Sequence, residues 1–198
     1  MSSHVADPIL LASTSPQRRL ILEQLGLPFD VVAPAYEEHD PPDADVYDLV
    51  REHARGKARS VARLGGPHRP VLGVDTAVAV DGAILGKPAN AAEAERMLER
   101  LAGRTHTVVS GLCLLTAAWE VVEHESTDVR FRELTPRELA QHLAHREWEG
   151  RAGAYAIQGR GAALVERVEG DYLNVVGLPA ALLVRLLAAR FPGAYGLG

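Results

Sequence analysis

Two charged residues that do not belong to its predicted turn lie in a strongly apolar stretch of the chain, VLGVDTAVAVDGAILGKP at residues 71–88. Asp75 ends the first apolar run, and Lys87 follows Gly86 at the far end. A carboxylate and an ammonium at one such point could serve a single site, the carboxylate as a metal ligand and the ammonium as a phosphate ligand. The alternative is a salt bridge at the rim of a sheet, which would contribute little.

The stretch itself predicts a β-hairpin. Its strands are Val71–Val80 and Ala83–Leu85, and Asp81-Gly82 suits the two-residue turn between them. In this register Thr76 faces Lys87, which brings Asp75 close to Lys87. An ideal pleat puts these two side chains on opposite faces, so a shared site requires the ladder to stop or bulge near Gly86. Apolar residues on both faces place the hairpin inside a covered sheet.

A hydroxyl-rich turn near the amino terminus is a second candidate site. A strand at residues 8–12 leads into Ser13-Thr14-Ser15-Pro16, where Ser15 is a predicted N-cap and Pro16 the first residue of a helix that ends at Gly26. The free N–H groups of such a terminus, with Arg18 and Arg19 beside them, could bind a phosphate. A capped helix with an arginine in its first turn is also a common structural feature.

An acidic loop and a lysine follow. The loop at residues 36–40, YEEHD, comes after a predicted strand at residues 29–33, so one of its carboxylates could hold a divalent cation; otherwise the loop is simply solvated. Asp45 then caps a long helix that ends at Gly65-Gly66. Lys57 lies at the edge of the apolar stripe of this helix, a position from which lysine commonly reaches solvent.

The middle of the chain has mainly structural signals. Asn90 starts a helix that closes at Gly103, two long strands at residues 105–116 and 119–132 form a pair, and a further helix runs from Thr135 through Ala144. On that last helix three side chains share one face and could bind a metal, although a solvated face is the more usual explanation: Glu138, His142 and His145.

A glycine-rich segment, residues 149–179, contains two predicted strands, residues 162–168 and Tyr172–Val176, before a closing helix at Ala180–Arg190. Glycine here indicates a close backbone approach, either to packed side chains or to a flat ligand. Gln158 can donate and accept hydrogen bonds in one plane, as reading a base edge requires. A buried glutamine that bonds to the loop backbone is the alternative.

Composition restricts the class of protein. The 198 residues suit one globular domain over residues 1–198 or two small lobes. A net charge of −5 without a basic block argues against a nucleic-acid or anionic-membrane surface. The single cysteine, Cys113, rules out a disulfide within the chain and a thiolate metal cage, and favours a reducing cytoplasm. We expect a soluble cytoplasmic protein, since no targeting or membrane-spanning segment is apparent.

Taken together, these candidate residues suit a binding site for a nucleoside triphosphate. Isolated basic residues would hold the phosphates, carboxylates would hold Mg²⁺ or a related cation, and a bound water would be the nucleophile. The motifs of serine hydrolases, P-loop proteins, Rossmann dinucleotide sites and HExxH metalloproteases do not occur in the sequence.

Eight blocks, in this order, resemble the Maf family of nucleoside triphosphate pyrophosphatases, also described as septum-formation inhibitors: LASTSPQRRLILEQLGLPF, AYEEHD, GKAR, VLGVDTAVAVDGAILGKP, LAGRTHTVVSGL, STDVRF, GRAGAYAIQG and YLNVVGLP. The resemblance covers nearly the whole chain. It implies an α/β fold with an elongated mixed β-sheet flanked by helices and two lobes with a substrate cleft between them, in a chain that often forms a homodimer. It also implies hydrolysis of a nucleoside triphosphate to the monophosphate and pyrophosphate with a divalent cation, Mg²⁺ or Mn²⁺.

The same resemblance assigns site residues. Asp75 is the first choice to activate water, and Glu38 shares the metal with it. The remaining implied residues are the basic pair Lys57 and Lys87, the phosphate-binding turn of Ser13, Ser15 and Arg18, and the substrate-binding residues Thr76 and Gln158. The YxIQG block around Gln158 is similar to the branch that prefers dTTP and UTP.

One departure from the family pattern concerns the phosphate turn, where Gln17 stands in place of the usual arginine. The lost guanidinium would weaken phosphate binding unless Arg19 supplies the charge, and we expect activity to survive. A different class of function also stays open, namely a nucleotide-binding regulator of cell division with little or no hydrolysis.

Overall fold

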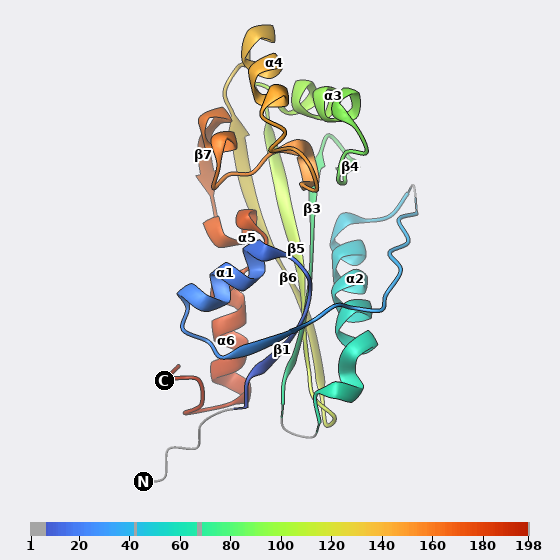
Figure 1. Ribbon diagram of the computed structural model, residues 1–198, viewed down its shortest axis with the longest axis vertical. Coiled ribbons are helices and arrows are strands. Elements are labelled where there is room, and N and C mark those ends of the chain that lie inside the picture. Colours follow the sequence, from blue (N-terminus) through green and yellow to red (C-terminus); the bar gives the residue numbers. More distant parts are fainter. Residues whose placement is uncertain (1–6, 42, 67–68, 198) are drawn as a thin grey trace. The chain divides into compact units, whose positions relative to one another are not determined.

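The computed structural model describes residues 7–41, 43–66 and 69–197 (Figure 1). Their contacts group into two compact units. Unit 1 takes in Met1–Asp75, Ser110–Glu125 and Gly177–Gly198, as far as these are described, and unit 2 takes in Thr76–Val109 and Ser126–Val176. Each unit is therefore built from separate segments of the chain, so residues far apart in sequence meet within it.

The described residues form a mixed sheet of seven strands in the order β2-β1-β3-β5-β6-β7, with β4 paired to β3. β1 is parallel to β2 and β3, whereas β4 and β7 run antiparallel to their partners. This confirms the predicted α/β class. The strands are β1 Ile9–Ala12, β2 Phe29–Val32, β3 Val71–Val80, β4 Ala83–Leu85, β5 Thr105–Leu115, β6 Glu120–Phe131 and β7 Val165–Glu169.

Besides the seven strands, the described residues form six α-helices and three short 3₁₀ helices. The α-helices are α1 Pro16–Gln24, α2 Val46–Val61, α3 Ala91–Leu101, α4 Pro136–Ala144, α5 Tyr172–Val176 and α6 Ala180–Arg190. The 3₁₀ helices are η1 Ala62–Leu64, η2 Ala152–Ala154 and η3 Arg160–Leu164. None of the helices in this part of the chain has the length and apolar character that a membrane crossing needs.

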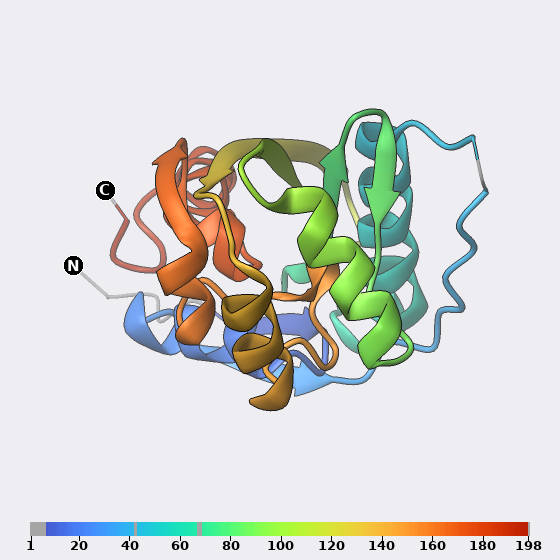
Figure 2. The same ribbon diagram turned by 90° about the horizontal axis from the view of Figure 1, so that it is seen from above.

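In unit 1, helices cover both faces of the sheet. All four residues of β1 are buried, so neither of its faces meets solvent. α2 packs on one face through Ala54, Ala58 and Val61, which form one apolar cluster with Leu10 and Ala12 of β1. α1 and α6 lie on the opposite face of this part of the sheet (Figures 1 and 2). Unit 1 is thus a three-layer helix–sheet–helix sandwich.

Two glycines let α2 approach the sheet closely. A Cβ built on Gly73 of β3 would come within 2.1 Å of the Ala54 carbonyl oxygen, and one on Gly111 of β5 within 2.1 Å of the Val50 carbonyl oxygen. Any larger residue at either position would push the helix away from the strands. The short separation fixes the height of α2 above β3, and with it the position of every side chain that α2 points along the sheet.

Unit 2 has its own core. Side chains of β3, β5 and β6 pack there with α3 and with the segment that contains η2, and Phe131 and Leu98 are among the fully buried members. The predicted hairpin is confirmed: Val80 pairs with Ala83 and Val78 with Leu85, and Asp81 and Gly82 both have positive φ. The ladder ends at Leu85, which is the stop near Gly86 that a site shared by Asp75 and Lys87 requires.

The sequence interpretation was wrong at two elements of unit 2. Tyr172–Val176, predicted as a strand, is helix α5, and the strand predicted at residues 162–168 begins only at Val165 because η3 precedes it. The side chain of Asp171 accepts a hydrogen bond from the Leu173 backbone N–H at 2.8 Å, which is a helix cap rather than a hairpin turn. The amide of the buried Asn174 then donates to the Val108 carbonyl oxygen at 3.0 Å, and this tertiary contact outweighs the β propensity of the valines.

Candidate active site

The centre of the site in unit 1 is a lysine between two carboxylates. The Lys57 ammonium lies 2.6 Å from a carboxylate oxygen of Glu38 and 2.6 Å from one of Asp75. The side chains of Lys57 and Asp75 are only 10% and 13% exposed, and that of Glu38 is 40% exposed. The positive charge offsets the repulsion between the two carboxylates, so three of the predicted residues converge on one point.

The local sequence explains why Lys57 is there. Asp45 caps α2 by accepting hydrogen bonds from the backbone N–H groups of Tyr47 and Asp48, as predicted. Lys57 then follows Ala54 and precedes Ala58, which pack on the sheet at the close approach that Gly73 permits. A lysine at the edge of an apolar stripe commonly reaches solvent. The Lys57 side chain instead runs along the sheet to Asp75.

The predicted phosphate turn forms a hydrogen-bonded loop between β1 and α1. The buried Ser13 hydroxyl accepts from the Ser15 backbone N–H at 3.2 Å and from the Arg18 guanidinium at 3.1 Å. Arg18 also donates to the Gly177 carbonyl oxygen at 2.9 Å, which ties the turn to the segment before α6. Ser15 is the N-cap residue, but its side chain makes no capping hydrogen bond, so the helix terminus has no side-chain cap.

Electrostatics link this turn to the carboxylate pair. Burial lowers the pKa of the Arg18 guanidinium, while the negative charges of Asp75 and Glu38 oppose that shift. An arginine keeps its charge in proteins despite such shifts. Arg18, Lys57, Glu38 and Asp75 therefore act as one group of two positive and two negative charges, next to a helix amino terminus with its positive dipole end.

Gln17 and Arg19 bear on the departure noted in the sequence. The Gln17 side chain accepts a hydrogen bond from the Ser15 hydroxyl at 3.2 Å. A terminal nitrogen of Arg19 contacts the Thr14 carbonyl oxygen at 3.4 Å, whereas its buried Nε has no hydrogen-bond partner among the described residues. A buried donor without a partner is unfavourable unless a ligand or water satisfies it. The replacement of the missing charge by Arg19 stays a prediction.

The donor set fits a hard divalent cation only in part. Among the described residues no group of three or more histidine, cysteine, aspartate or glutamate side chains lies close enough to hold a metal. Glu38 and Asp75 nevertheless present two carboxylates to one point. Mg²⁺ is commonly held by one or two carboxylates together with substrate phosphates, so these two residues fit a metal that arrives with a nucleotide.

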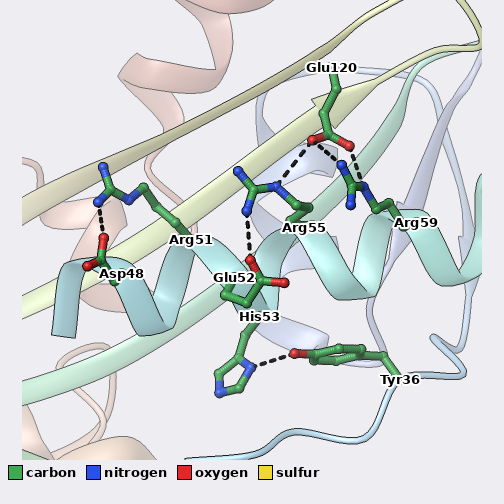
Figure 3. A network of polar contacts seen from close by, with 8 residues as sticks. All are labelled: Tyr36, Asp48, Arg51, Glu52, His53, Arg55, Arg59 and Glu120. Carbon is green, nitrogen blue, oxygen red and sulfur yellow. Dashed lines mark hydrogen bonds and ion pairs between the residues drawn. The ribbon is translucent and has the colours of Figure 1, made fainter. Parts of the chain in front are cut away.

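A second network on α2 was not found from the sequence. The Tyr36 hydroxyl lies 3.0 Å from Nδ1 of His53, and Nε2 of the same ring lies 2.8 Å from an Asp40 carboxylate oxygen (Figure 3 shows the contact with Tyr36). His53 is buried one helical turn before Lys57. Its i, i+4 spacing from Lys57 was the available signal, but nothing in the sequence indicates that the acidic loop returns to this helix face.

The remaining predicted residues belong to unit 2. Thr76 is partly buried in β3, Lys87 is exposed after β4, and Gln158 is exposed in a turn between η2 and η3, which rules out the buried-glutamine alternative. The Gly153 backbone N–H donates to the Gly86 carbonyl oxygen at 3.2 Å, so the segments that carry Lys87 and Gln158 are joined. The predicted proximity of Lys87 to Asp75, and the cleft between two lobes, stay predictions.

The weakest of the metal hypotheses is wrong for the described structure. Glu138 forms the capping box of α4 with Thr135, and His142 is buried against the Ala154 carbonyl oxygen at 3.3 Å. They form no metal group with His145.

In the glycine-rich segment the close approaches are to packed protein atoms, since a Cβ on Gly153 would lie 3.0 Å from the Val78 side chain. Cys113 is buried, and burial raises the pKa of its thiol to about 12.

Comparisons with known proteins identify the family. The family model described as Maf-like protein matches residues 8–190. A dTTP/UTP pyrophosphatase of Symbiobacterium thermophilum is 46% identical over 179 residues, 90% of this chain and 92% of that protein. A dTTP/UTP pyrophosphatase of Deinococcus radiodurans is 43% identical over 197 residues, 100% of both chains.

A solved structure, the Ham1 protein of Staphylococcus aureus, is similar at 15% identity with a TM-score of 0.45, over 63% of this chain and 72% of that one, a level that carries no further conclusion. The family model and the relatives confirm the resemblance found in the sequence blocks. The chain belongs to the Maf-like protein family.

Proposed function

We propose that this protein is a nucleoside triphosphate pyrophosphatase that hydrolyses dTTP and UTP, with modified pyrimidine nucleotides as further candidate substrates, to the monophosphate and pyrophosphate. The relatives named for this activity cover the chain almost completely. The single observation that carries the proposal is the meeting of Lys57, Glu38 and Asp75 at one point, in electrostatic reach of Arg18. Cations for phosphates and carboxylates for a metal are the groups this reaction requires.

The chemistry assigns a role to each residue. The Asp75 carboxylate accepts a proton from the attacking water, whose oxygen forms a bond to the α-phosphorus. The bond from that phosphorus to the oxygen bridging to the β-phosphorus breaks, and its electrons leave with pyrophosphate. Negative charge grows on the bridging oxygen, and fixed cations stabilise it more in the transition state than in the substrate. Arg18 and Lys57 supply those cations, and Lys87 is proposed to add a third.

Glu38 and Asp75 are the residues that would hold a divalent cation, Mg²⁺ or Mn²⁺. When bound, the cation supplies Lewis-acid polarisation of the phosphoryl oxygens and neutralises part of the triphosphate charge. The Ser13–Arg18 turn, with the uncapped amino terminus of α1, is proposed to seat phosphate oxygens. Thr76 and Gln158 are proposed to contact the nucleoside, with Gln158 reading the base edge.

A nucleotide panel tests the activity. The purified protein is incubated with Mg²⁺ or Mn²⁺ and with dTTP, UTP, dCTP, dATP and GTP, and the products are separated by ion-exchange chromatography. We expect monophosphate and pyrophosphate in equal amounts, fastest from dTTP and UTP. Release of orthophosphate in place of pyrophosphate would contradict the proposal.

The second candidate is the nucleotide-binding regulator of cell division. It predicts binding of dTTP or UTP, measured by calorimetry, without turnover of any nucleotide in the panel. The same protein preparation therefore separates the two functions.

A further inference from the structure

The β2–α2 loop carries Glu38, and it contacts α2 with every second residue. Tyr36 contacts His53, Glu38 contacts Lys57, and Asp40 contacts His53 again. Glu37 and His39, between them, are exposed, and so are the side chains of Glu38 and Asp40, at 40% and 67%, so the alternation is one of contacts and not of burial. Alternation of this kind is what an extended chain gives when one of its sides lies along another element. The loop is thus attached to α2 on both sides of Glu38.

His53 can satisfy both of its contacts at once. A carboxylate only accepts hydrogen bonds, so Nε2–H of His53 donates to Asp40, and Nδ1 is the ring nitrogen that meets the Tyr36 hydroxyl. The imidazole therefore bridges two loop residues that flank Glu38.

Gly56 makes room for the Tyr36 ring. A Cβ built at position 56 would lie 2.1 Å from the ring, closer than any real contact allows. The ring also meets the His53 imidazole edge to face, with centroids 5.7 Å apart. The seat for Tyr36 is thus formed by two residues of α2, and Lys57 directly follows the glycine in sequence.

Glu38 needs such a tether more than its partner Asp75 does. Asp75 lies on β3, whose hydrogen-bonded neighbours fix its backbone. Glu38 lies on a loop without regular structure, has a longer side chain and is more exposed. If the loop were not attached to α2, holding the Glu38 side chain in one place would cost substantial conformational entropy. The attachment lowers this cost, because the loop backbone is already ordered.

We propose that His53 is a positioning residue: with Tyr36 and Asp40 it fastens the β2–α2 loop to α2 and thereby holds Glu38 against Lys57 and Asp75. Its effect on catalysis rests on the proposed pyrophosphatase function, in which Glu38 holds the metal. Groups that orient a metal ligand without touching the metal commonly change affinity or rate when they are removed.

The first test is the steady-state kinetics of His53→Leu with dTTP and Mn²⁺. We expect kcat to fall about tenfold or more and the Mn²⁺ concentration for half-maximal rate to rise by a similar factor, while KM for dTTP changes less than about threefold. Wild-type kcat and metal dependence in this variant would overturn the proposal.

A double-mutant cycle tests whether His53 acts through Glu38. In a Glu38→Gln background, adding His53→Leu should lower kcat/KM by less than about twofold, because the carboxylate that His53 positions is already gone. If the double variant instead loses the product of the two single effects, His53 acts on another group and the proposal is wrong.

Rescue and control variants separate positioning from general stability. His53→Asn places an amide near the position of Nδ1, so it should recover part of the rate that His53→Leu loses; a rate no higher than that of leucine counts against the hydrogen-bonding role. Val50→Ala is the control, because Val50 is fully buried on the same helix and its backbone lies where α2 approaches Gly111 of the sheet. We expect it to lower the melting temperature while kcat stays within about twofold of wild type. An equal loss of kcat in both variants at equal stability would overturn the proposal.

A measurement independent of activity uses the sequence of the loop. A glutamyl endopeptidase cleaves after Glu37 and Glu38, and cleavage of the folded protein reports how often the loop leaves α2. His53→Leu and Gly56→Ala should each speed cleavage at this loop by about fivefold or more relative to wild type, and Val50→Ala should not. Unchanged cleavage overturns the attachment. If the wild-type protein turns over no nucleotide, the proposed function fails, and the cleavage rates still decide the attachment.

Discussion

Helix α2 carries two polar clusters of similar chemistry and different burial. One faces the acidic loop and β3, where Lys57 meets Glu38 and Asp75. The other faces the start of β6, where Arg55 and Arg59 meet Glu120 (Figure 3). The shortest nitrogen–oxygen distances hardly differ, 2.6 Å for Lys57 to Asp75 and 2.7 Å for Arg59 to Glu120. Distance alone would rank the two clusters as equals.

Burial separates them. Lys57 and Asp75 are almost out of solvent, whereas Arg59 is 61% and Glu120 27% exposed. Water and salt screen a charge at the surface, so an ion pair there contributes little. A buried charge that loses its partner cannot be resolvated, and it acts on its neighbours through a lower dielectric. The comparison shows that the ion pairs on the loop side of α2 are shielded from water and those on the β6 side are not, which supports the proposed catalytic role of the loop side.

The largest effect is expected from Asp75→Asn, which keeps the shape of the side chain and removes its charge and basicity. Pyrophosphate release from dTTP should fall by about 10³-fold or more, because both the proton acceptor and a metal ligand are lost. The circular dichroism spectrum should stay that of the folded protein. The matched control is Asp48→Asn, at an exposed residue on α2 that pairs with Arg51. Near-normal turnover by Asp75→Asn would remove this residue from the mechanism.

Lys57→Met, compared with Arg55→Met, tests the two sides of α2 directly. The first change removes the ammonium between Glu38 and Asp75 and leaves Arg18 as the nearby cation, so kcat for dTTP should fall by about 10²-fold and the melting temperature should drop. Arg55 pairs with Glu52 and Glu120 at the surface, and its replacement should leave kcat within about twofold. Equal losses of kcat would show that burial is not what distinguishes the clusters.

Gln158→Ala extends the comparison to unit 2, where we expect selectivity to change more than chemistry. The ratio of kcat/KM for dTTP to that for GTP should fall by about tenfold, since one hydrogen-bonding group of the base would lose its partner. Pyrophosphate should remain the product. An unchanged ranking of dTTP, UTP and GTP would show that a different group reads the base.

The smallest effect is expected from Glu120→Gln, with an unfolding free energy reduced by about 0.5–1 kcal/mol at pH 7 and kcat unchanged. The hydrogen bond from Arg59 holds the pKa of the Glu120 carboxyl below its ordinary 4.5, although burial opposes this. The stability that Glu120 adds is therefore fully present above pH 4.5, the ordinary pKa of its carboxyl group. It is lost as the pH falls through the lower pKa that this group has in the folded protein. Urea titrations of the two proteins, made in steps from pH 7 downward, should show a difference in unfolding free energy that shrinks once the pH is below 4.5, and a difference that stays constant would contradict the assignment.

Much of the fold could be predicted because its signals are local. Asp45, Asn90 and Thr135 each cap the helix that the sequence indicated, and Asp81-Gly82 forms the predicted turn. These features depend on hydrogen bonds and backbone angles within a few residues. The helix α5 was missed because its valines favour a strand, and the contacts of Asn174 that decide the matter come from β5 and β6.

The candidate site divides in the same way. Residue type and family pattern were sufficient to name Ser13, Arg18, Glu38, Lys57 and Asp75, since phosphates require cations and a metal requires carboxylates. The attachment of the acidic loop to His53 could not be predicted. Tyr36 and Asp40 lie 17 and 13 positions from His53 in the sequence, and no local pattern indicates which residue a tyrosine or a histidine contacts at such a distance.

By itself the sequence determined the elements, the turns and the residue types available for chemistry, because capping, turn geometry and side-chain charge are properties of short segments. The tertiary structure alone decided which of those charges lose contact with water. Gly73, Gly111 and Gly56 set how closely α2 approaches the sheet and how closely Tyr36 approaches α2. That separation is what puts Lys57 between two carboxylates while Arg59, on the same helix, remains in solvent.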